Sequence, residues 1–186
     1  MDFTEYQEEI IEDVKSCLEN LQVQPILFMG AGISQRYIKA PDWEGLLKQL
    51  AEICPLIKRP YGYYSQTKGD NKPLIASDFC DFYAEWAWDD GKDRYPETYF
   101  EGTTPKDIYI KHEIASILNE LSNSVDFSNM EYTEEVQKLR KVKPHAIITT
   151  NYDDTLEKIF ENYQAIVGHN VVKVNYSSYG EIMKIH

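Results

Sequence analysis

The segment KPHAIITTNYDD, Lys143–Asp154, decides how we interpret the fold. It contains a short apolar run rich in β-branched residues that ends in the uncharged polar residues Thr149, Thr150 and Asn151. Such a run is typical of a buried strand, and the acidic residues after it are typical of a helix start. Open α/β sheets bind ligands beyond the carboxyl ends of their strands. We therefore expect a binding site where this strand ends.

A second predicted strand, residues 24–29, ends in a glycine-rich turn, Gly30–Ser34. Two bare peptide units in such a turn allow a phosphate or a ribose to approach the backbone closely. The turn is no Walker loop, and Gln35 stands where a dinucleotide fingerprint has its last glycine. A plain strand-to-loop turn remains an alternative. Because residues 36–41 separate this turn from the next predicted helix, we expect a loop there that covers a bound ligand.

Strand and helix patterns alternate along the chain. Helices are predicted over residues 4–19, 42–51, 76–88, 105–121, 132–142 and 153–163, and strands over 24–29, 144–149, 165–167, 171–174 and 182–185. This alternation favours an α/β fold, a parallel sheet with helices on both faces. We expect one domain over residues 1–186, with a loop and helical insertion over 55–142. The sequence ends directly after a strand, so we expect a sheet that is incomplete at the C-terminus and the N-terminal part of a longer protein.

Composition and charge restrict the partners. The 186 residues carry a net charge of −12, which opposes direct binding to nucleic acid or anionic membranes. No apolar run approaches transmembrane length, and no signal peptide is evident, so we expect a cytoplasmic protein. Cys17, Cys54 and Cys80 show no metal-pair spacing and are interpreted as buried reduced thiols; no metal is expected.

Three polar residues are candidates for chemistry at a sugar. The neutral amide of Asn151 can orient a water molecule or bind a ribose hydroxyl. An ionised Asp153 can stabilise the positive charge that develops when a bond to an anomeric carbon breaks. The imidazole of His186 can accept a proton near neutrality. Helix capping by Asn151 or Asp153 is an alternative, and both interpretations can hold at once. The other histidines are interpreted as structural or exposed: His112, His145 and His169.

Four motifs stand in one order along the chain: Gly30–Ser34, Ala40–Trp43, Thr149–Asp153 and Met183–His186. Together they resemble the sirtuin superfamily, and most of all the sirtuin-like domains at the N-terminus of bacterial anti-phage defence proteins. The motifs span nearly the whole chain, although residues 54–143 match nothing specific in that family. The resemblance implies a Rossmann-like fold that binds NAD.

The resemblance also implies a role for individual residues. The NAD-binding positions would be Gly30, Ala31, Gly32, Ser34, Asp42, Thr150, Asn151 and Asp153. Asn151 and His186 would form the catalytic pair, with His186 at the histidine of the family's Lys-x-His-Gly motif.

Departures from the family direct the choice of reaction. Deacetylating members carry two Cys-x-x-Cys pairs for a structural zinc, which this chain lacks, and Gln where Thr150 stands. They also have Phe-Arg where this chain has Trp43 and Glu44. The defence-type members hydrolyse NAD to nicotinamide and ADP-ribose and so deplete the infected cell. The resemblance further implies a homo-oligomer, with a C-terminal sensor domain or a phage-derived trigger. The alternatives are an NAD-dependent protein deacylase, an NAD- or ADP-ribose-binding regulatory module without turnover, and a purely structural half-domain.

Overall fold

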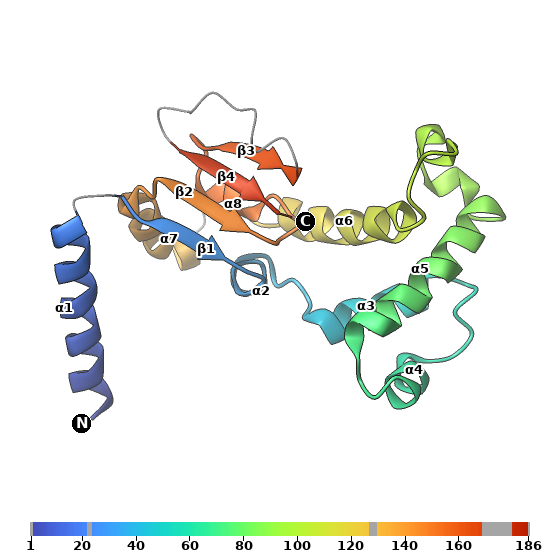
Figure 1. The fold of residues 1–186 in the computed structure, drawn as a ribbon, viewed down its shortest axis with the longest axis horizontal. Helices are drawn as coiled ribbons and strands as arrows, with labels where there is room; N and C mark the ends of the chain where they lie inside the picture. The colour runs from blue at the N-terminus through green and yellow to red at the C-terminus, as the bar shows by residue number, and fades with distance from the viewer. Residues whose placement is uncertain (1, 22–23, 127–129, 169–179, 186) are drawn as a thin grey trace. The chain divides into compact units, whose positions relative to one another are not determined.

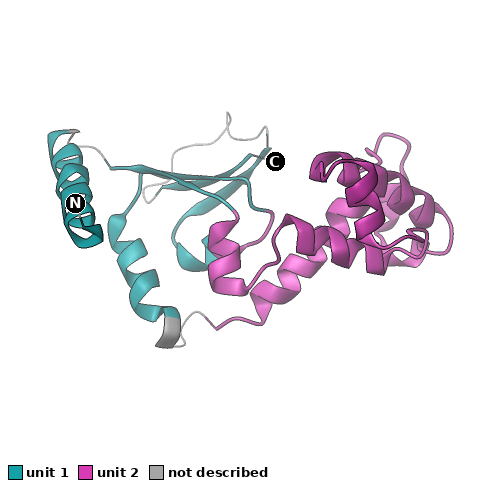
Figure 2. Ribbon diagram, turned by 90° about the horizontal axis from the view of Figure 1, so that it is seen from below, with its two compact units in different colours: residues 1–30, 127–151, 156–186 teal, residues 31–126, 152–155 magenta. Residues whose placement is uncertain are grey.

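The computed structural model describes residues 2–21, 24–126, 130–168 and 180–185. The chain divides into two compact units, which Figure 2 colours separately. Unit 1 comprises residues 1–30, 127–151 and 156–186, and unit 2 comprises residues 31–126 and 152–155. Unit 1 is therefore assembled from three separate stretches of the chain.

The described residues of unit 1 include a four-stranded sheet with the order β1-β2-β4-β3. Its strands are β1 (Ile26–Met29), β2 (Ala146–Thr149), β3 (Gln164–Val167) and β4 (Glu181–Lys184). All neighbouring strands are parallel, so their carboxyl ends reach the same edge of the sheet, as the arrowheads in Figure 1 show. This parallel sheet flanked by helices confirms the predicted α/β class. The strand predicted over residues 171–174 lies outside the described residues.

Burial differs between the two faces of the sheet. The strand register aligns Leu27, Ile147 and Ile182 in one row, and the latter two are fully buried. On the opposite face, Ile26 and Phe28 of the outer strand β1 are 59% and 67% exposed. The apolar run of β2 therefore reflects burial on one face and partial burial on the other, and β1 is buried only in part.

Three helices that the structure describes belong wholly or mostly to unit 1: α1 (Phe3–Leu21), α7 (Met130–Val142) and α8 (Thr155–Ile159). α7 begins two residues before the predicted helix and ends where it was predicted. α8 is much shorter than the helix predicted over residues 153–163. The side chain of Arg140 donates to the carbonyl oxygens of Ile159 at 2.6 Å and Lys158 at 3.2 Å. These contacts satisfy the last carbonyl groups of α8, which therefore ends without a continuing helical turn.

Gly180, which directly precedes β4, has no room for a side chain. Its φ is +119°, and a Cβ atom there would lie 2.5 Å from Cε1 of Tyr163 and 2.9 Å from the carbonyl oxygen of His145. The Tyr163 ring is held in place because its hydroxyl donates a 2.7 Å hydrogen bond to the carbonyl oxygen of Pro144. We expect Gly180→Ala to lower the free energy of unfolding by about 2–4 kcal/mol. Urea unfolding followed by circular dichroism measures this loss.

Gly168→Ala is the matched control. Gly168 also has a positive φ, +63°, but nothing lies within 4 Å of the Cβ position. Its replacement should cost only the backbone strain, about 1 kcal/mol. Equal losses in the two variants would show that the contact with Tyr163 is not what requires glycine at position 180.

Unit 2 is helical throughout its regular elements. These are α2 (Gly32–Ile38), α3 (Trp43–Ile53), α4 (Tyr61–Thr67), α5 (Lys72–Trp88), α6 (Ile108–Asn123) and the short 3₁₀ helices η1 (Lys92–Arg94) and η2 (Glu97–Phe100). Asp42 caps α3, because its Oδ1 accepts a hydrogen bond from the backbone N–H of Gly45 at 2.7 Å.

Among the helices of unit 2, α4, α5 and α6 differ from the sequence-based prediction. α4 lies in a stretch expected to be a loop, because burial of Tyr61 and Tyr64 on one face overrides its weak helix propensity. α5 begins earlier than predicted, because the Asn71 side chain accepts from the backbone N–H of Leu74 and caps the helix there. α6 begins later than predicted, because Pro105 starts a turn before it. In this turn, the carbonyl oxygen of Pro105 accepts a hydrogen bond from the backbone N–H of Ile108.

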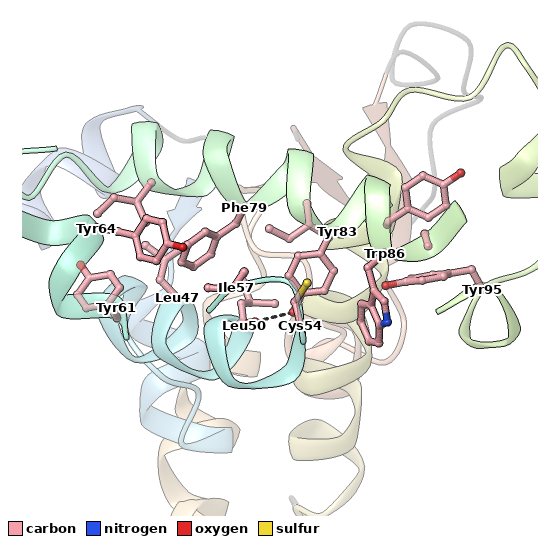
Figure 3. Packing of buried hydrophobic residues seen from close by; sticks show 14 residues of the cluster. Leu47, Leu50, Cys54, Ile57, Tyr61, Tyr64, Phe79, Tyr83, Trp86 and Tyr95 are labelled. Carbon is pink, nitrogen blue, oxygen red and sulfur yellow. Dashed lines mark hydrogen bonds between the residues drawn. The ribbon is translucent and has the colours of Figure 1, made fainter. Parts of the chain in front are cut away.

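The core of unit 2 lies between α3, α4 and α5, with contributions from α6 and the segment between α5 and α6 (Figure 3). Phe79, Tyr83 and Trp86 of α5 are all buried in this core. Trp88, near the end of the same helix, is 61% exposed. At about 100° per residue, Trp88 lies half a turn away from Phe79 and therefore on the opposite side of the helix.

Two tyrosines in this core make stability depend on alkaline pH. Burial, as the largest cause, raises the pKa of the Tyr83 and Tyr95 phenols above the ordinary value of 10.0. Unfolding exposes both phenols, so the stability they confer is complete below about pH 10 and is lost as the pH rises further. We expect the free energy of unfolding to fall by about 1.4 kcal/mol per pH unit for each tyrosine above that value. Urea unfolding between about pH 9 and pH 11 measures the slope.

Tyr83→Phe isolates the contribution of Tyr83 to the pH dependence of stability. The Tyr83 hydroxyl donates a 2.8 Å hydrogen bond to the carbonyl oxygen of Leu50, drawn as a dashed line in Figure 3. Because the variant lacks this bond, its free energy of unfolding at neutral pH should be lower by about 1 kcal/mol. Above about pH 10, the free energy of unfolding of this variant should fall less steeply with pH than that of the wild type, by the contribution of one tyrosine. Tyr63→Phe, at a half-exposed ring, is the control and should keep the wild-type slope. An unchanged slope in Tyr83→Phe would contradict the assignment.

The cysteines and the helix lengths complete the fold. Cys54 is buried and Cys80 partly buried, and burial raises the pKa of both thiols, whereas Cys17 is exposed, contrary to the expectation. Within the described ranges, none of the helices has both the length and the apolar character needed to span a membrane.

Candidate functional site at the carboxyl ends of the strands

In unit 1, the ends of β1 and β2 bring two of the predicted site residues together. Met29 and Thr149 are partners in the parallel register, so the residues that follow them leave the sheet side by side. The side-chain amide of Asn151 donates a 3.1 Å hydrogen bond to the carbonyl oxygen of Gly30. Asn151 is only 7% exposed. Its amide is therefore held at the edge of the sheet where parallel sheets bind ligands.

Thr149 organises this edge of the sheet, although it is not among the NAD-binding positions that the resemblance implies. It is fully buried, and its Oγ1 accepts a 3.0 Å hydrogen bond from the backbone N–H of Asn151. Its carbonyl oxygen accepts a 3.0 Å hydrogen bond from the backbone N–H of Ile185. One residue thus fixes both Asn151 and the end of β4. A polar side chain at the last position of a buried strand was the available signal. His186, which follows Ile185 in the chain, lies outside the described residues.

A buried ion pair also belongs to this part of unit 1. The ammonium group of Lys184 lies 2.5 Å from Oε1 of Glu157, with side chains 8% and 26% exposed. Lys184 was part of the motif at the end of the sequence, but nothing in the sequence indicated that Glu157 on α8 is its partner. The pair holds the last residues of β4 against α8, because a buried lysine requires a nearby carboxylate.

In unit 2, two other predicted residues form a hydrogen bond. The Ser34 hydroxyl donates to Oδ2 of Asp153 at 2.6 Å, and both residues are 3% exposed. The second carboxylate oxygen, Oδ1, accepts from the backbone N–H of Thr155 at 3.0 Å. Asp153 therefore caps the start of α8, as the capping alternative predicted, and at the same time holds Ser34.

The segment after the glycine turn differs from the prediction. We expected residues 36–41 to form a covering loop, but α2 begins at Gly32 and continues to Ile38. Tyr37 and Ile38 are both 1% exposed, so their burial keeps this stretch helical. Lys39 then ends the helix in the left-handed conformation, with a φ of +56°. The prediction of a loop cover is wrong for residues 36–38.

Neither glycine of the turn is required by the backbone or by packing. Gly30 and Gly32 both lack a positive φ, and a Cβ atom at either position would meet nothing within 4 Å. The space beside each backbone is therefore open, as the close approach of a ligand requires. Within unit 1, the uncharged amide of Asn151 beside Gly30 suits the hydroxyl and amide groups of a nucleoside.

The remaining predicted residues lie exposed on their units. Thr150 lies on unit 1, and Ala31 and Asp42 lie on unit 2, where the Asp42 carboxylate caps α3. Their roles in NAD binding stay predictions. In the part of the chain that the structure describes, no group of three or more His, Cys, Asp or Glu side chains could hold a metal ion.

The arrangement in unit 1 presents a fixed amide next to an exposed threonine, and the arrangement in unit 2 presents a buried, oriented carboxylate. An amide can bind and orient a hydroxyl or a water molecule, and a carboxylate stabilises a developing positive charge. No protein-family model matches the chain, and no curated protein matches it significantly.

Proposed function

We propose that the protein is an NAD hydrolase that releases nicotinamide and ADP-ribose. The observation that carries the proposal is the buried amide of Asn151, held by the carbonyl oxygen of Gly30 at the carboxyl end of β2. The open space beside Gly30 and Gly32, and the four motifs that resemble the sirtuin superfamily, support NAD as the substrate.

The reaction requires few groups from the protein. The bond between the nicotinamide nitrogen and the ribose anomeric carbon breaks, and the electron pair leaves with nicotinamide. Water adds its oxygen to the anomeric carbon and loses a proton to solvent or to a base. Because one N–H of the Asn151 amide is tied to Gly30, the plane of the amide is fixed and can orient this water or a ribose hydroxyl.

Charge stabilisation is the proposed task of Asp153. The transition state at the ribose carries positive charge, which a carboxylate in a buried setting stabilises more strongly than one in water. Ser34 acts as a positioning residue, because its hydroxyl orients the Asp153 carboxylate. His186, as the resemblance implies, would accept the proton from the water or orient a ribose hydroxyl.

The biological setting of this proposal rests on the resemblance. NAD loss in an infected cell would serve anti-phage defence, with activity in a homo-oligomer controlled by a sensor domain or a phage-derived trigger. A deacylase is the less favoured enzyme, because the chain lacks the cysteine pairs of the zinc module.

One observation favours a second candidate, a module that binds NAD or ADP-ribose without turnover. Both carboxylate oxygens of Asp153 already accept hydrogen bonds, one from Ser34 and one from Thr155. A carboxylate with both oxygens hydrogen-bonded within the protein can have a purely structural role, without a role in catalysis.

Incubation of the protein with NAD distinguishes these functions. Equal amounts of free nicotinamide and ADP-ribose, quantified by liquid chromatography, are expected for the hydrolase. Product that forms only when an acetyl-lysine peptide is added would support the deacylase. A thermal shift with NAD but no product would favour the binding module. Neither a product nor a thermal shift would contradict every NAD-based proposal.

A further inference from the structure

A cavity of about 740 Å³ lies at the opposite end of the sheet from Asn151. It is lined by the first residues of three strands, Ile26, Ala146 and Glu181, and by residues just before them and at the end of α8. All of its lining residues belong to unit 1. Its volume lies within the range of small-molecule sites in proteins, about 300–1,000 Å³.

Glu181 is the unusual group in this cavity. Glu181 is 6% exposed, and its Oε1 is buried without a hydrogen-bond partner among the described residues. A buried carboxylate oxygen without a donor is costly and rare in native proteins. A ligand that brings N–H donors or a positive charge to Glu181 would remove this cost.

The backbone holds Glu181 in place. It is the first residue of β4 and is aligned with Ala146 on one side and Gln164 on the other. The preceding residue, Gly180, is packed so closely against Tyr163 and the carbonyl oxygen of His145 that no side chain fits there. A carboxylate on such a rigid support is preorganised to bind a ligand, because little order is lost on binding.

The other lining residues indicate what kind of ligand fits. Ile26, Ile148 and Met183 add apolar side chains, and so select a ligand with an apolar body. The net charge of −12 attracts cations and repels anions.

Arg140 and Lys143, the lysine and arginine side chains that line the same cavity, do not prevent a cation from binding. The guanidinium of Arg140 lies 2.5 Å from Oε1 of Glu161 and also donates to two carbonyl oxygens, so its charge is paired. Lys143 is exposed, so solvent weakens its repulsion of a cation.

We infer that this cavity is a binding site for a small organic ammonium or amidinium ion with an apolar body, whose N–H groups donate to Glu181. The site lies at the amino ends of the strands and is independent of the proposed NAD site at their carboxyl ends.

Benzamidine is the first probe, with neutral benzamide and anionic benzoate as compounds of similar shape. Isothermal titration calorimetry on the whole 186-residue chain should show benzamidine binding at least about tenfold more tightly than either of the other two. Benzoate or benzamide binding as tightly as benzamidine would overturn the inference, and so would a lack of benzamidine binding.

Two variants test the residues. Glu181→Gln should weaken benzamidine binding at least about tenfold. Without ligand, it should raise the midpoint of thermal unfolding by about 3 °C, because it replaces a buried carboxylate whose Oε1 has no hydrogen-bond partner among the described residues with a neutral amide. Lys143→Gln, the matched control, should tighten binding about twofold, because a like charge is removed. Wild-type affinity in Glu181→Gln would overturn the inference.

Asn151→Ala separates this inference from the proposed function. The variant should bind benzamidine with wild-type affinity, because Asn151 lies beyond the carboxyl end of β2 and does not line the cavity. A loss of benzamidine binding in Asn151→Ala would overturn the independence of the two sites. The result is not affected by whether the protein hydrolyses NAD.

Discussion

Asn151→Ala is expected to reduce the hydrolysis of NAD by about 10²–10³-fold or more, to the point where nicotinamide release is no longer detected. The variant removes the side-chain amide that donates to the carbonyl oxygen of Gly30 at the carboxyl end of β2. An oriented hydrogen-bonding group in a buried site is worth far more than one in water, so its loss should affect the rate more than the fold. Nicotinamide release at saturating NAD measures the effect.

Stability must be measured beside activity in this variant. Loss of the hydrogen bond to Gly30 should cost only about 1 kcal/mol, which leaves the protein folded in a thermal melt. Asn20→Ala, which changes an exposed asparagine on α1, is the matched control and should keep wild-type turnover. His186→Ala should also abolish turnover, as the resemblance to the sirtuin superfamily implies. Undiminished turnover in both Asn151→Ala and His186→Ala would refute the proposed catalytic pair.

Phe79→Ala is expected to lower the free energy of unfolding of unit 2 by about 3–5 kcal/mol. The Phe79 ring is fully buried and packs edge-to-face against Tyr64, with ring centroids 5.1 Å apart. Its removal leaves a cavity between α4 and α5 that the surrounding side chains cannot fill without rearrangement. Urea unfolding followed by tryptophan fluorescence reports on this core, because Trp86 lies in it.

Leu74→Ala on the same helix is the control for the core prediction. Leu74 is 50% exposed, so its truncation should cost less than about 1 kcal/mol. Similar losses in Leu74→Ala and Phe79→Ala would mean that the centre of unit 2 lies elsewhere.

The parallel sheet could be predicted from the sequence because its strands are short apolar runs that end in polar residues. β2 ends at Thr149, which closes the apolar run, and the register confirms that β1 and β2 end together. The capping role of Asp42 was also predictable, because a cap depends on a residue only three positions away.

Helix lengths were less predictable, because they depend on distant partners. α8 is shorter than its apolar and charged pattern indicates, since Arg140 from α7 binds its last carbonyl groups. α2 extends to Ile38, through residues predicted to form a loop, because Tyr37 and Ile38 are buried. Neither partner can be identified from local sequence patterns.

By itself, the sequence determined the α/β class, the polar strand end at Asn151 and the glycine turn, because each follows from residue types within a few positions of one another. Only the tertiary structure decided that Asn151 binds Gly30, that Ser34 binds Asp153, and that Oε1 of Glu181 is buried without a hydrogen-bond partner among the described residues. These contacts join residues far apart in the chain or depend on burial, and both are consequences of packing that no local pattern encodes.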